Sequence, residues 1–280
     1  MARKLTWRER LARKSPRLAK QARRWVRSAA EGGCPVSRPI FVFGAQRSGT
    51  RVPLVALDRH PDVITFNEGS APFFDGVLLR DLDEVERRLA RSPFPWVVLK
   101  PICESHRAAE LVERFPGSLA IWIYRRWPDT VASAVAKWSS GVEAVRLLAE
   151  HPLDGAGWRA GGLSQARLDL VREVYRPEMS RPAADALLWY LRSSLFFDLG
   201  LSARPDILLV KYEDLVVDPQ RHFPGLFGFL GIPFEPAYVS DVYSSSVKPR
   251  RPPEGVPDLV LKLCHDLQSR LDEHYGRRRV

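Results

Sequence analysis

The sequence is poor in cysteine and has no long hydrophobic run. Its 280 residues include three cysteines, Cys34, Cys103 and Cys264, which are far apart and odd in number. This pattern excludes both a disulfide framework and a Cys-x-x-Cys zinc or redox site. The apolar stretches are only a few residues long, whereas a membrane-spanning helix needs roughly 20 apolar residues. We therefore expect passive thiols and no transmembrane helix.

Acidic residues are almost absent from the first 30 positions. Residues 1–30 hold eleven Lys or Arg and one acid, Glu9. The whole chain has 43 Lys or Arg and 33 Asp or Glu, so residues 31–280 hold 32 of each and are formally neutral. Because the basic charge belongs to a terminal segment, the domain has no nucleic-acid signature, and no nucleic-acid partner is expected. The segment also lacks the unbroken apolar stretch of a secretory signal, which predicts a cytoplasmic protein.

The basic segment is expected to be an arm, residues 1–37, in front of a domain at residues 38–280. A capping-box pair at Thr6 and Glu9 and the Ser15-Pro16 step predict two short helices. Leucine, leucine and tryptophan recur every seven residues, at positions 11, 18 and 25, so these helices are amphipathic. Residues 1–30 could contact an anionic membrane surface or an acidic partner, or form a solvated helical arm packed loosely on the domain.

From residue 38 onward, short β-branched and aromatic runs alternate with longer amphipathic segments. This alternation is typical of βαβ units and predicts an α/β fold of three layers with a central parallel sheet. Strands are expected at residues 40–43, 63–66, 96–100, 119–124 and 207–211. Helices are expected at residues 50–59, 81–91, 104–115, 130–138, 183–199 and 219–230. Residues 139–181 are expected to form an irregular insertion around a helix at residues 164–175 and to shape an acceptor pocket.

Residues 41–51, Phe-Val-Phe-Gly-Ala-Gln-Arg-Ser-Gly-Thr-Arg, form the most informative segment. A strand here enters a loop of small residues that opens a helix, and such a loop offers backbone N–H groups to a phosphate. The spacing from Gly44 to Gly49 matches the start of a P-loop, but Thr50 stands where a nucleotide hydrolase needs lysine. Arg47 is the available cation, and Ser48 and Thr50 offer hydroxyls to phosphate oxygens.

A second segment, residues 124–133, ends a strand in arginine and starts a helix at Pro128. Ser133 follows Arg125 by eight residues and falls about one and a half turns into that helix. The guanidinium and the hydroxyl could therefore converge on a second anion site. In the alternative interpretation, Arg125 or Arg126 pairs with Asp129 and Ser133 only packs.

Together the two segments resemble the donor-binding signatures of sulfotransferases that use 3′-phosphoadenosine 5′-phosphosulfate, PAPS. In that family a Pro-Lys/Arg-Ser-Gly-Thr-Thr loop holds the 5′-phosphosulfate, and an arginine with a serine eight positions later holds the 3′-phosphate. The matching residues here are 46–51, and Arg125 with Ser133. The arginine in the loop is closer to tyrosylprotein-type and bacterial carbohydrate-type members than to the cytosolic lysine-containing ones. The resemblance, from about residue 38 to 250, implies a P-loop-like sulfotransferase fold, PAPS as co-substrate and no metal.

The resemblance also assigns catalytic residues. Glu68 follows a strand and resembles the glutamate base of the family, which takes the proton from an acceptor hydroxyl. Lys100 ends the next strand and resembles the family lysine that, with Arg47, stabilises negative charge as the sulfuryl group departs. The alternative for Glu68 is a surface glutamate that caps a loop, and the alternative for Lys100 is a solvated side chain at the end of a strand. His106 is an alternative base.

Further donor contacts are weaker. Tyr212 could flank the adenine or be a core tyrosine, and Ser246 and Lys248 resemble phosphate contacts of a late loop. Arg51 stands where the family has a second threonine, and as an added cation it is expected to strengthen anion binding. Gln46 also departs from the family pattern by replacing proline.

These residues predict a PAPS-dependent sulfotransferase acting on a hydroxyl-bearing acceptor, a carbohydrate, a glycolipid or a small molecule. Two other classes stay open at this stage. One is a P-loop kinase or nucleotide hydrolase, against which Thr50 argues. The other is a non-catalytic binder of membranes or nucleic acids that acts through residues 1–30.

Overall fold

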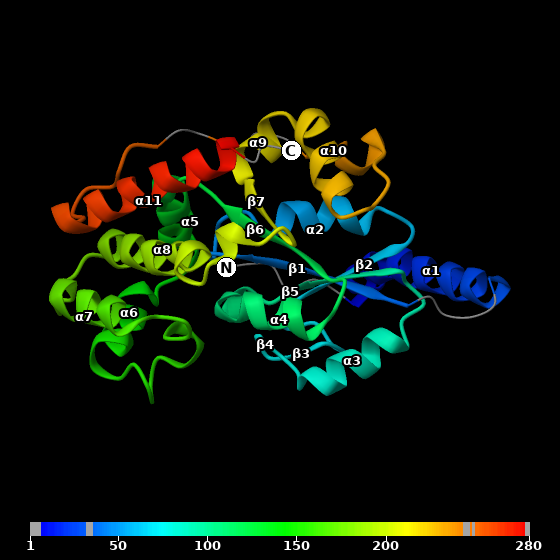
Figure 1. Cartoon of the computed structure of the whole chain (residues 1–280), viewed down its shortest axis with the longest axis horizontal. Helices are drawn as coiled ribbons and strands as arrows, with labels where there is room; N and C mark the ends of the chain where they lie inside the picture. The colour runs from blue at the N-terminus through cyan, green and yellow to red at the C-terminus, as the bar shows by residue number, and fades with distance from the viewer. Residues whose placement is uncertain (1–6, 32–35, 243–246, 248–249, 278–280) are drawn as a thin grey trace.

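The computed structural model describes residues 7–31, 36–242, 247 and 250–277, with side chains from residue 17 onward (Figure 1). Five parallel strands form the central sheet in the order β2-β5-β1-β6-β7. These strands are β1 (Arg38–Gly44), β2 (Val63–Asn67), β5 (Trp96–Lys100), β6 (Leu119–Tyr124) and β7 (Ile207–Lys211). Two short strands, β3 (Phe74–Asp75) and β4 (Leu78–Leu79), form a separate antiparallel pair. The five predicted strands and the parallel sheet are confirmed.

Helices cover both faces of the sheet, which gives the three expected layers (Figure 1). Alternate residues of a strand point to opposite faces, so in β1 Phe41 and Phe43 face one layer while Ile40 and Val42 face the other. One layer contains α2 (Arg51–Asp58), α9 (Tyr212–Val217) and α10 (Pro219–Phe229). The other contains α3 (Leu82–Ala90), α4 (Ala108–Arg114), α8 (Arg181–Asp198) and α11 (Asp258–Arg277).

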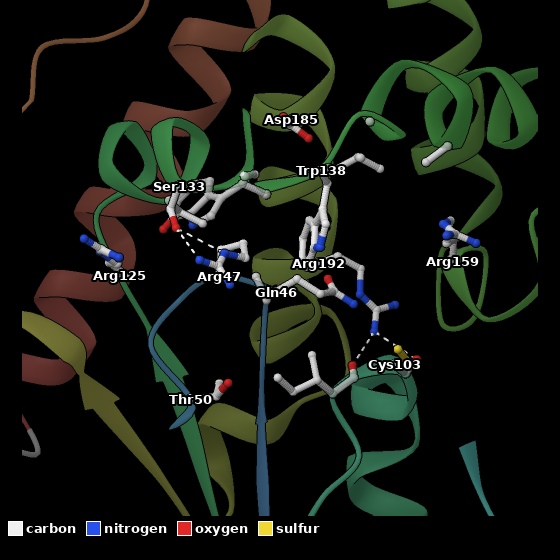
Figure 2. Close-up of a pocket in the computed structure, with 18 of the residues that line it drawn as sticks. Gln46, Arg47, Thr50, Cys103, Arg125, Ser133, Trp138, Arg159, Asp185 and Arg192 are labelled. Carbon is white, nitrogen blue, oxygen red and sulfur yellow. Dashed lines mark hydrogen bonds between the residues drawn. The ribbon is translucent and has the colours of Figure 1, made fainter. Parts of the chain in front are cut away.

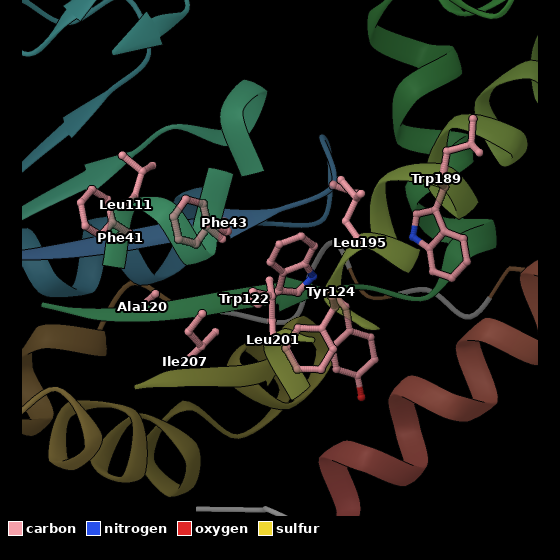
Figure 3. Packing of buried hydrophobic residues seen from close by; sticks show 14 of the residues in the cluster. Phe41, Phe43, Leu111, Ala120, Trp122, Tyr124, Trp189, Leu195, Leu201 and Ile207 are labelled. Carbon is pink, nitrogen blue, oxygen red and sulfur yellow. The ribbon is translucent and has the colours of Figure 1, made fainter. Parts of the chain in front are cut away.

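The larger of the two cores is aromatic (Figure 3). Phe43 and Trp122 lie side by side, with ring centroids 6.4 Å apart, and Phe196 of α8 packs on Trp122 at 5.8 Å. All three side chains are fully buried. Burying a side chain of this kind contributes about 1.5–3 kcal/mol. The aromatic layer therefore fixes α8 against the strands whose ends form the site described below.

The predicted insertion at residues 139–181 is more regular than expected. It holds α6 (Gly141–Glu150), a 3₁₀ turn at Gly157–Arg159 and α7 (Gln165–Val174). Val145 and Leu148 of α6 and Val171 of α7 are buried in the larger core. The glycines around residues 155–162 break the segment into short pieces and obscured α6 in the sequence. Helices α9 and α11 were not expected either, and the predicted helix at residues 104–115 begins as a 3₁₀ turn at Ile102–Arg107.

The prediction of two helices in the basic arm is wrong, because one helix, α1 (Trp7–Ala30), runs through Pro16. Its second half is held on the domain by basic side chains. Arg17 donates to the Thr65 carbonyl at 2.6 Å, and Lys20 lies 3.7 Å from the Asp58 carboxylate. A proline inside a helix removes one backbone hydrogen bond. The contacts to the α2–β2 segment help to offset that loss and keep the helix continuous.

Helix α1 packs on the domain through several of its basic side chains. Arg24 is buried, and both Arg24 and Arg27 pair with Asp62 of the domain. Leu18 and Trp25, two members of the seven-residue repeat, are more than half exposed. Over residues 17–30, several basic side chains thus contact the domain while the apolar positions face outward. Among the described helices, none has the length and apolar character needed to cross a bilayer.

Candidate active site

A cavity of about 990 Å³ opens where all five strands of the sheet end. Carboxyl ends of parallel strands are the usual ligand-binding edge of an open α/β sheet. Each strand contributes a lining residue at or just beyond its last position: Ala45, Glu68, Lys100, Arg125 and Tyr212. Helices α5 (Trp127–Lys137), α6 and α8 close the other side of the cavity.

The loop after β1 is shaped by two glycines. Gly44 has φ +137°, and a Cβ there would lie 2.3 Å from the Ile123 carbonyl oxygen of β6. Gly49 has φ +85°, and a Cβ there would lie 2.0 Å from the Tyr212 ring. Both positions therefore require glycine, and the loop can turn tightly between the strand and α2. Gln46, Arg47, Gly49 and Thr50 of this loop line the cavity.

Arg47 joins the loop to the second predicted anion site (Figure 2). Its Nε and Nη2 donate to the Ser133 Oγ of α5 at 3.1 and 2.9 Å. Arg47 also has φ +67°, a conformation that costs a non-glycine residue about 1–3 kcal/mol. Burial lowers the pKa of Arg47, and the neighbouring Arg125 lowers it further. The fold thus holds a strained, partly desolvated cation within the cavity, a feature often found at functional sites.

Arg125 occupies the end of β6, as the sequence predicted. Its guanidinium lies over the Tyr212 ring, 4.6 Å from the centroid, and both residues line the cavity. The alternative ion pair is formed by its neighbour, because Arg126 bonds to Asp129 and its backbone N–H donates to Glu213 Oε1 at 3.1 Å. Arg125 and Ser133 are therefore both presented to the cavity.

The two predicted catalytic residues lie in direct contact. Lys100 Nζ forms an ion pair with Glu68 Oε2, and the Ile102 backbone N–H donates to Glu68 Oε1 at 3.1 Å. Lys100 is 8% exposed, and Glu68 is only partly exposed. Strands β2 and β5 are neighbours in register, with Asn67 opposite Lys100, which brings the next residue, Glu68, beside the lysine. Lys100 is therefore not the solvated side chain of its alternative interpretation. The bond from the Ile102 N–H also agrees with a Glu68 that caps a loop.

The cavity is strongly cationic although the domain around it is formally neutral. Among the described residues, six cationic side chains and two acidic ones line it. The cations are Arg47, Arg51, Lys100, Arg125, Arg159 and Arg192, and the acids are Glu68 and Asp185. Walls of one charge sign focus the field inside a cleft and raise the local concentration of oppositely charged ligands. The arrangement suits a ligand with more than one anionic group.

Some predicted site residues are placed differently. Ser48 is fully buried, and its Oγ has no hydrogen-bond partner among the described residues and does not line the cavity. Its side chain therefore faces the interior and not the cavity. Ser246 and Lys248 lie outside the described residues. His106 is packed against Gly161, where burial lowers its pKa to about 4, and it lies off the cavity wall.

The sequence analysis missed residues supplied by α8 and the insertion. Arg192 and Asp185 of α8 line the cavity, together with Trp158 of the insertion. Burial raises the pKa of Asp185 to about 6, although Arg181 opposes the shift. The sequence did offer one indication of Arg192. It is the only charged residue in a mostly apolar run, Leu-Leu-Trp-Tyr-Leu-Arg-Ser-Ser-Leu-Phe-Phe. Cys103 also lines the cavity, and burial raises its pKa to about 11, which agrees with an unreactive thiol.

Comparisons with solved structures identify the fold. The sulfotransferase domain from the curacin biosynthetic pathway superposes with a TM-score of 0.51 and 16% sequence identity, over 84% of this chain and 98% of that domain. The chain has a sulfotransferase fold. A sulfotransferase domain from the Synechococcus PCC 7002 olefin synthase gives a TM-score of 0.47 at 15% identity, over 83% of this chain and 95% of its own. Mouse sulfotransferase SULT7A1, complexed with PAP, gives a TM-score of 0.42 at 15% identity, over 88% of this chain and 85% of the mouse chain.

The assignment of the sulfotransferase fold rests on the first of these structures, because its TM-score exceeds 0.5. At 16% identity the likeness establishes the fold and not the reaction. No protein-family model and no curated protein matches the sequence.

Proposed function

We propose that the chain is a sulfotransferase that moves a sulfuryl group from PAPS to an acceptor hydroxyl. The products are a sulfate ester and adenosine 3′,5′-bisphosphate. The observation that carries the proposal is the bond between Arg47 of the loop and Ser133 of α5, with Arg125 beside them in one cationic cavity. The two bonded residues belong to the two segments that resemble the donor-binding signatures. They are 86 residues apart in the sequence, yet they meet in a single site.

The cavity fits a donor with anionic groups at two ends. Its volume of about 990 Å³ lies at the upper end of the usual range for ligand sites. The loop around Arg47 and Gly49 would hold the phosphosulfate, and Arg125 with Ser133 would hold the 3′-phosphate. Tyr212, which packs between Gly49 and Arg125, would flank the nucleoside. When bound, the donor supplies the activated sulfuryl group.

The residues of the chain would supply proton transfer and charge stabilisation. Glu68, held by the Ile102 N–H, would take the proton of the acceptor hydroxyl while the hydroxyl oxygen forms a bond to sulfur. The bond between sulfur and the bridging phosphate oxygen breaks in the same step. Lys100 and Arg47 would stabilise the negative charge that develops on that oxygen. Most of the acceleration would come from positioning and electrostatics, as in phosphoryl transfer.

The proposal can be tested by transfer of label. We expect the purified protein to move ³⁵S from PAPS to at least one member of a panel of carbohydrates, glycolipids and small hydroxylated molecules. A parallel incubation with γ-labelled ATP tests the kinase alternative, since Thr50 replaces the lysine that such enzymes need. Turnover of ATP, together with no detectable binding of adenosine 3′,5′-bisphosphate, would overturn the proposal.

A further inference from the structure

Arg192 is a buried cation that the proposed reaction does not use. It lies within α8, is 4% exposed and lines the cavity. Its Nε and Nη1 have no hydrogen-bond partner among the described residues. Its Nη2 has only two long bonds, to the carbonyl oxygens of Ile102 at 3.3 Å and Cys103 at 3.4 Å. A buried guanidinium with so few acceptors is costly unless a ligand completes its interactions.

The surroundings of Arg192 add no negative charge. Among the described residues no carboxylate pairs with it. The neighbouring groups that act on its pKa are Cys103, whose own pKa of about 11 keeps the thiol uncharged at neutral pH, and Arg159, which is a cation. Burial lowers the pKa of Arg192 to about 10, so the group stays protonated at neutral pH. The ring of Trp158 lies over the guanidinium, 5.4 Å from its carbon. Arginine is less strongly hydrated than lysine and suits such a partly aromatic anion site.

Arg192 lies beside the catalytic pair and away from the donor end of the cavity. The backbone of Ile102 connects them, because its N–H donates to Glu68 at 3.1 Å and its carbonyl accepts from Arg192 at 3.3 Å. In Figure 2, Arg125 and Ser133 lie on one side of Arg47, whereas Arg192 and Cys103 lie on the other. An acceptor hydroxyl next to Glu68 would therefore have Arg192 within reach of its neighbouring groups.

We propose that Arg192 recognises an anionic group on the acceptor, placed within a few bonds of the hydroxyl that receives the sulfuryl group. This inference rests on the proposed sulfotransferase function and names its acceptor class, hydroxylated acids. The body of the acceptor would lie against the apolar lining of the cavity. That lining includes Leu148, Trp138, Trp158, Leu188, Trp189 and Leu191.

The proposal is tested by comparing matched ligands that differ in charge. Calorimetry is carried out on the full chain saturated with adenosine 3′,5′-bisphosphate, with the pairs 3-hydroxybenzoate and 3-hydroxybenzamide, and glucuronate and glucose. A charge-assisted hydrogen bond predicts that the acid of at least one pair binds about tenfold more tightly than its neutral partner. A further titration with 3-hydroxybenzenesulfonate tells whether Arg192 prefers a carboxylate or a sulfonate group.

Two variants locate the preference. Arg192→Gln should abolish the difference between acid and neutral ligand while leaving the affinity for adenosine 3′,5′-bisphosphate within about twofold. Arg159→Gln, the control, removes a partly exposed cation of the same cavity and should keep most of the preference. If Arg192→Gln does not fold, Arg192→Lys keeps the charge without the planar donors and should reduce the preference.

Equal binding of acid and neutral ligand by the wild-type chain in both pairs would overturn the inference. A preference that survives in Arg192→Gln, or is lost equally in Arg159→Gln, would also overturn it, because the net charge of the cavity would then be responsible. Failure of the wild-type chain to bind adenosine 3′,5′-bisphosphate would instead contradict the proposed function. The two failures are therefore distinguishable.

Discussion

At the scale of single residues, Glu68 and Lys100 are the most sensitive test of the chemistry. We expect Glu68→Gln to lower turnover by about 10²–10⁴-fold, since the amide cannot accept the acceptor proton. The affinity for adenosine 3′,5′-bisphosphate should stay nearly unchanged, because that ligand would contact the loop and Arg125 instead. Steady-state rates with labelled PAPS and calorimetry with the bisphosphate measure the two effects separately. Glu110→Gln, at an exposed ion pair outside the cavity, is the control.

Unchanged turnover in Glu68→Gln would remove Glu68 from the mechanism. A simultaneous loss of bisphosphate binding would show that the residue supports the cavity structurally.

The buried carboxyl group of Asp185 should make the stability of the fold depend on pH. Burial raises its pKa from 3.8 to about 6, so the folded state binds this proton more tightly than the unfolded state. The ionised form therefore destabilises the fold fully above pH 6, and the penalty disappears as the pH falls through 4. We expect Asp185→Asn to raise the free energy of unfolding at pH 7 by up to about 3 kcal/mol and to have little effect near pH 4.

Urea unfolding at several pH values between 4 and 7 measures this difference between Asp185→Asn and the wild type. Asp154→Asn, at an exposed position, should change stability by no more than about 0.5 kcal/mol. A constant effect of Asp185→Asn over the whole pH range would contradict the assignment.

The position of a side chain could be predicted from the sequence where the residue sits at the end of a strand. Glu68, Lys100 and Arg125 were singled out by the resemblance, and their positions at the ends of predicted strands bring them to one cavity, since parallel strands end at a common edge. Ser48 and Arg192 could not be placed in this way. Whether a loop hydroxyl turns inward, or a helical arginine turns toward a cavity, depends on tertiary packing that the sequence pattern does not contain.

At the scale of elements, the loop after β1 depends on Gly49. In Gly49→Ala the new methyl group would collide with the buried Tyr212 ring, and φ +85° is unfavourable for alanine. We expect a loss of about 2–4 kcal/mol in stability and at least a tenfold weaker binding of adenosine 3′,5′-bisphosphate. Thermal unfolding and calorimetry give the two quantities.

Gly117→Ala is the matched control for this variant. Gly117 has φ +80°, close to that of Gly49, but a methyl group added there would meet no atom within 4 Å. It should therefore lose only about 1 kcal/mol from the backbone conformation and keep its affinity for the bisphosphate. Equal stability and equal affinity of the two variants would contradict the account of the loop.

The elements themselves were predictable to different degrees. Strands β5, β6 and β7 match their predicted ranges, because each is a buried run of β-branched and aromatic residues. Helix α6 was missed between glycine-rich breaks. Helix α1 was divided wrongly at Pro16, since its docking on Asp58 and Asp62 is a tertiary contact that local capping signals do not report.

At the scale of the whole molecule, the fold concentrates positive charge. Residues 31–280 are formally neutral, yet the cavity at the ends of the strands carries six cations and two acids among its described residues. The formal charge of +10, which first suggests a nucleic-acid binder, belongs to the arm, where Arg17, Lys20 and Arg24 contact the domain itself. The distribution of charge, and not its total, therefore points to a small anionic ligand.

The central claim is that one cavity binds both anionic ends of the donor nucleotide. Its most direct test is calorimetric titration of adenosine 3′,5′-bisphosphate and of adenosine 5′-monophosphate into the wild type, Arg125→Gln and the surface control Arg146→Gln. We predict that the wild type and Arg146→Gln bind the bisphosphate at least about tenfold more tightly than the monophosphate, and that Arg125→Gln loses this difference. No heat with the bisphosphate, or equal affinities for the two nucleotides in the wild type, would contradict the account.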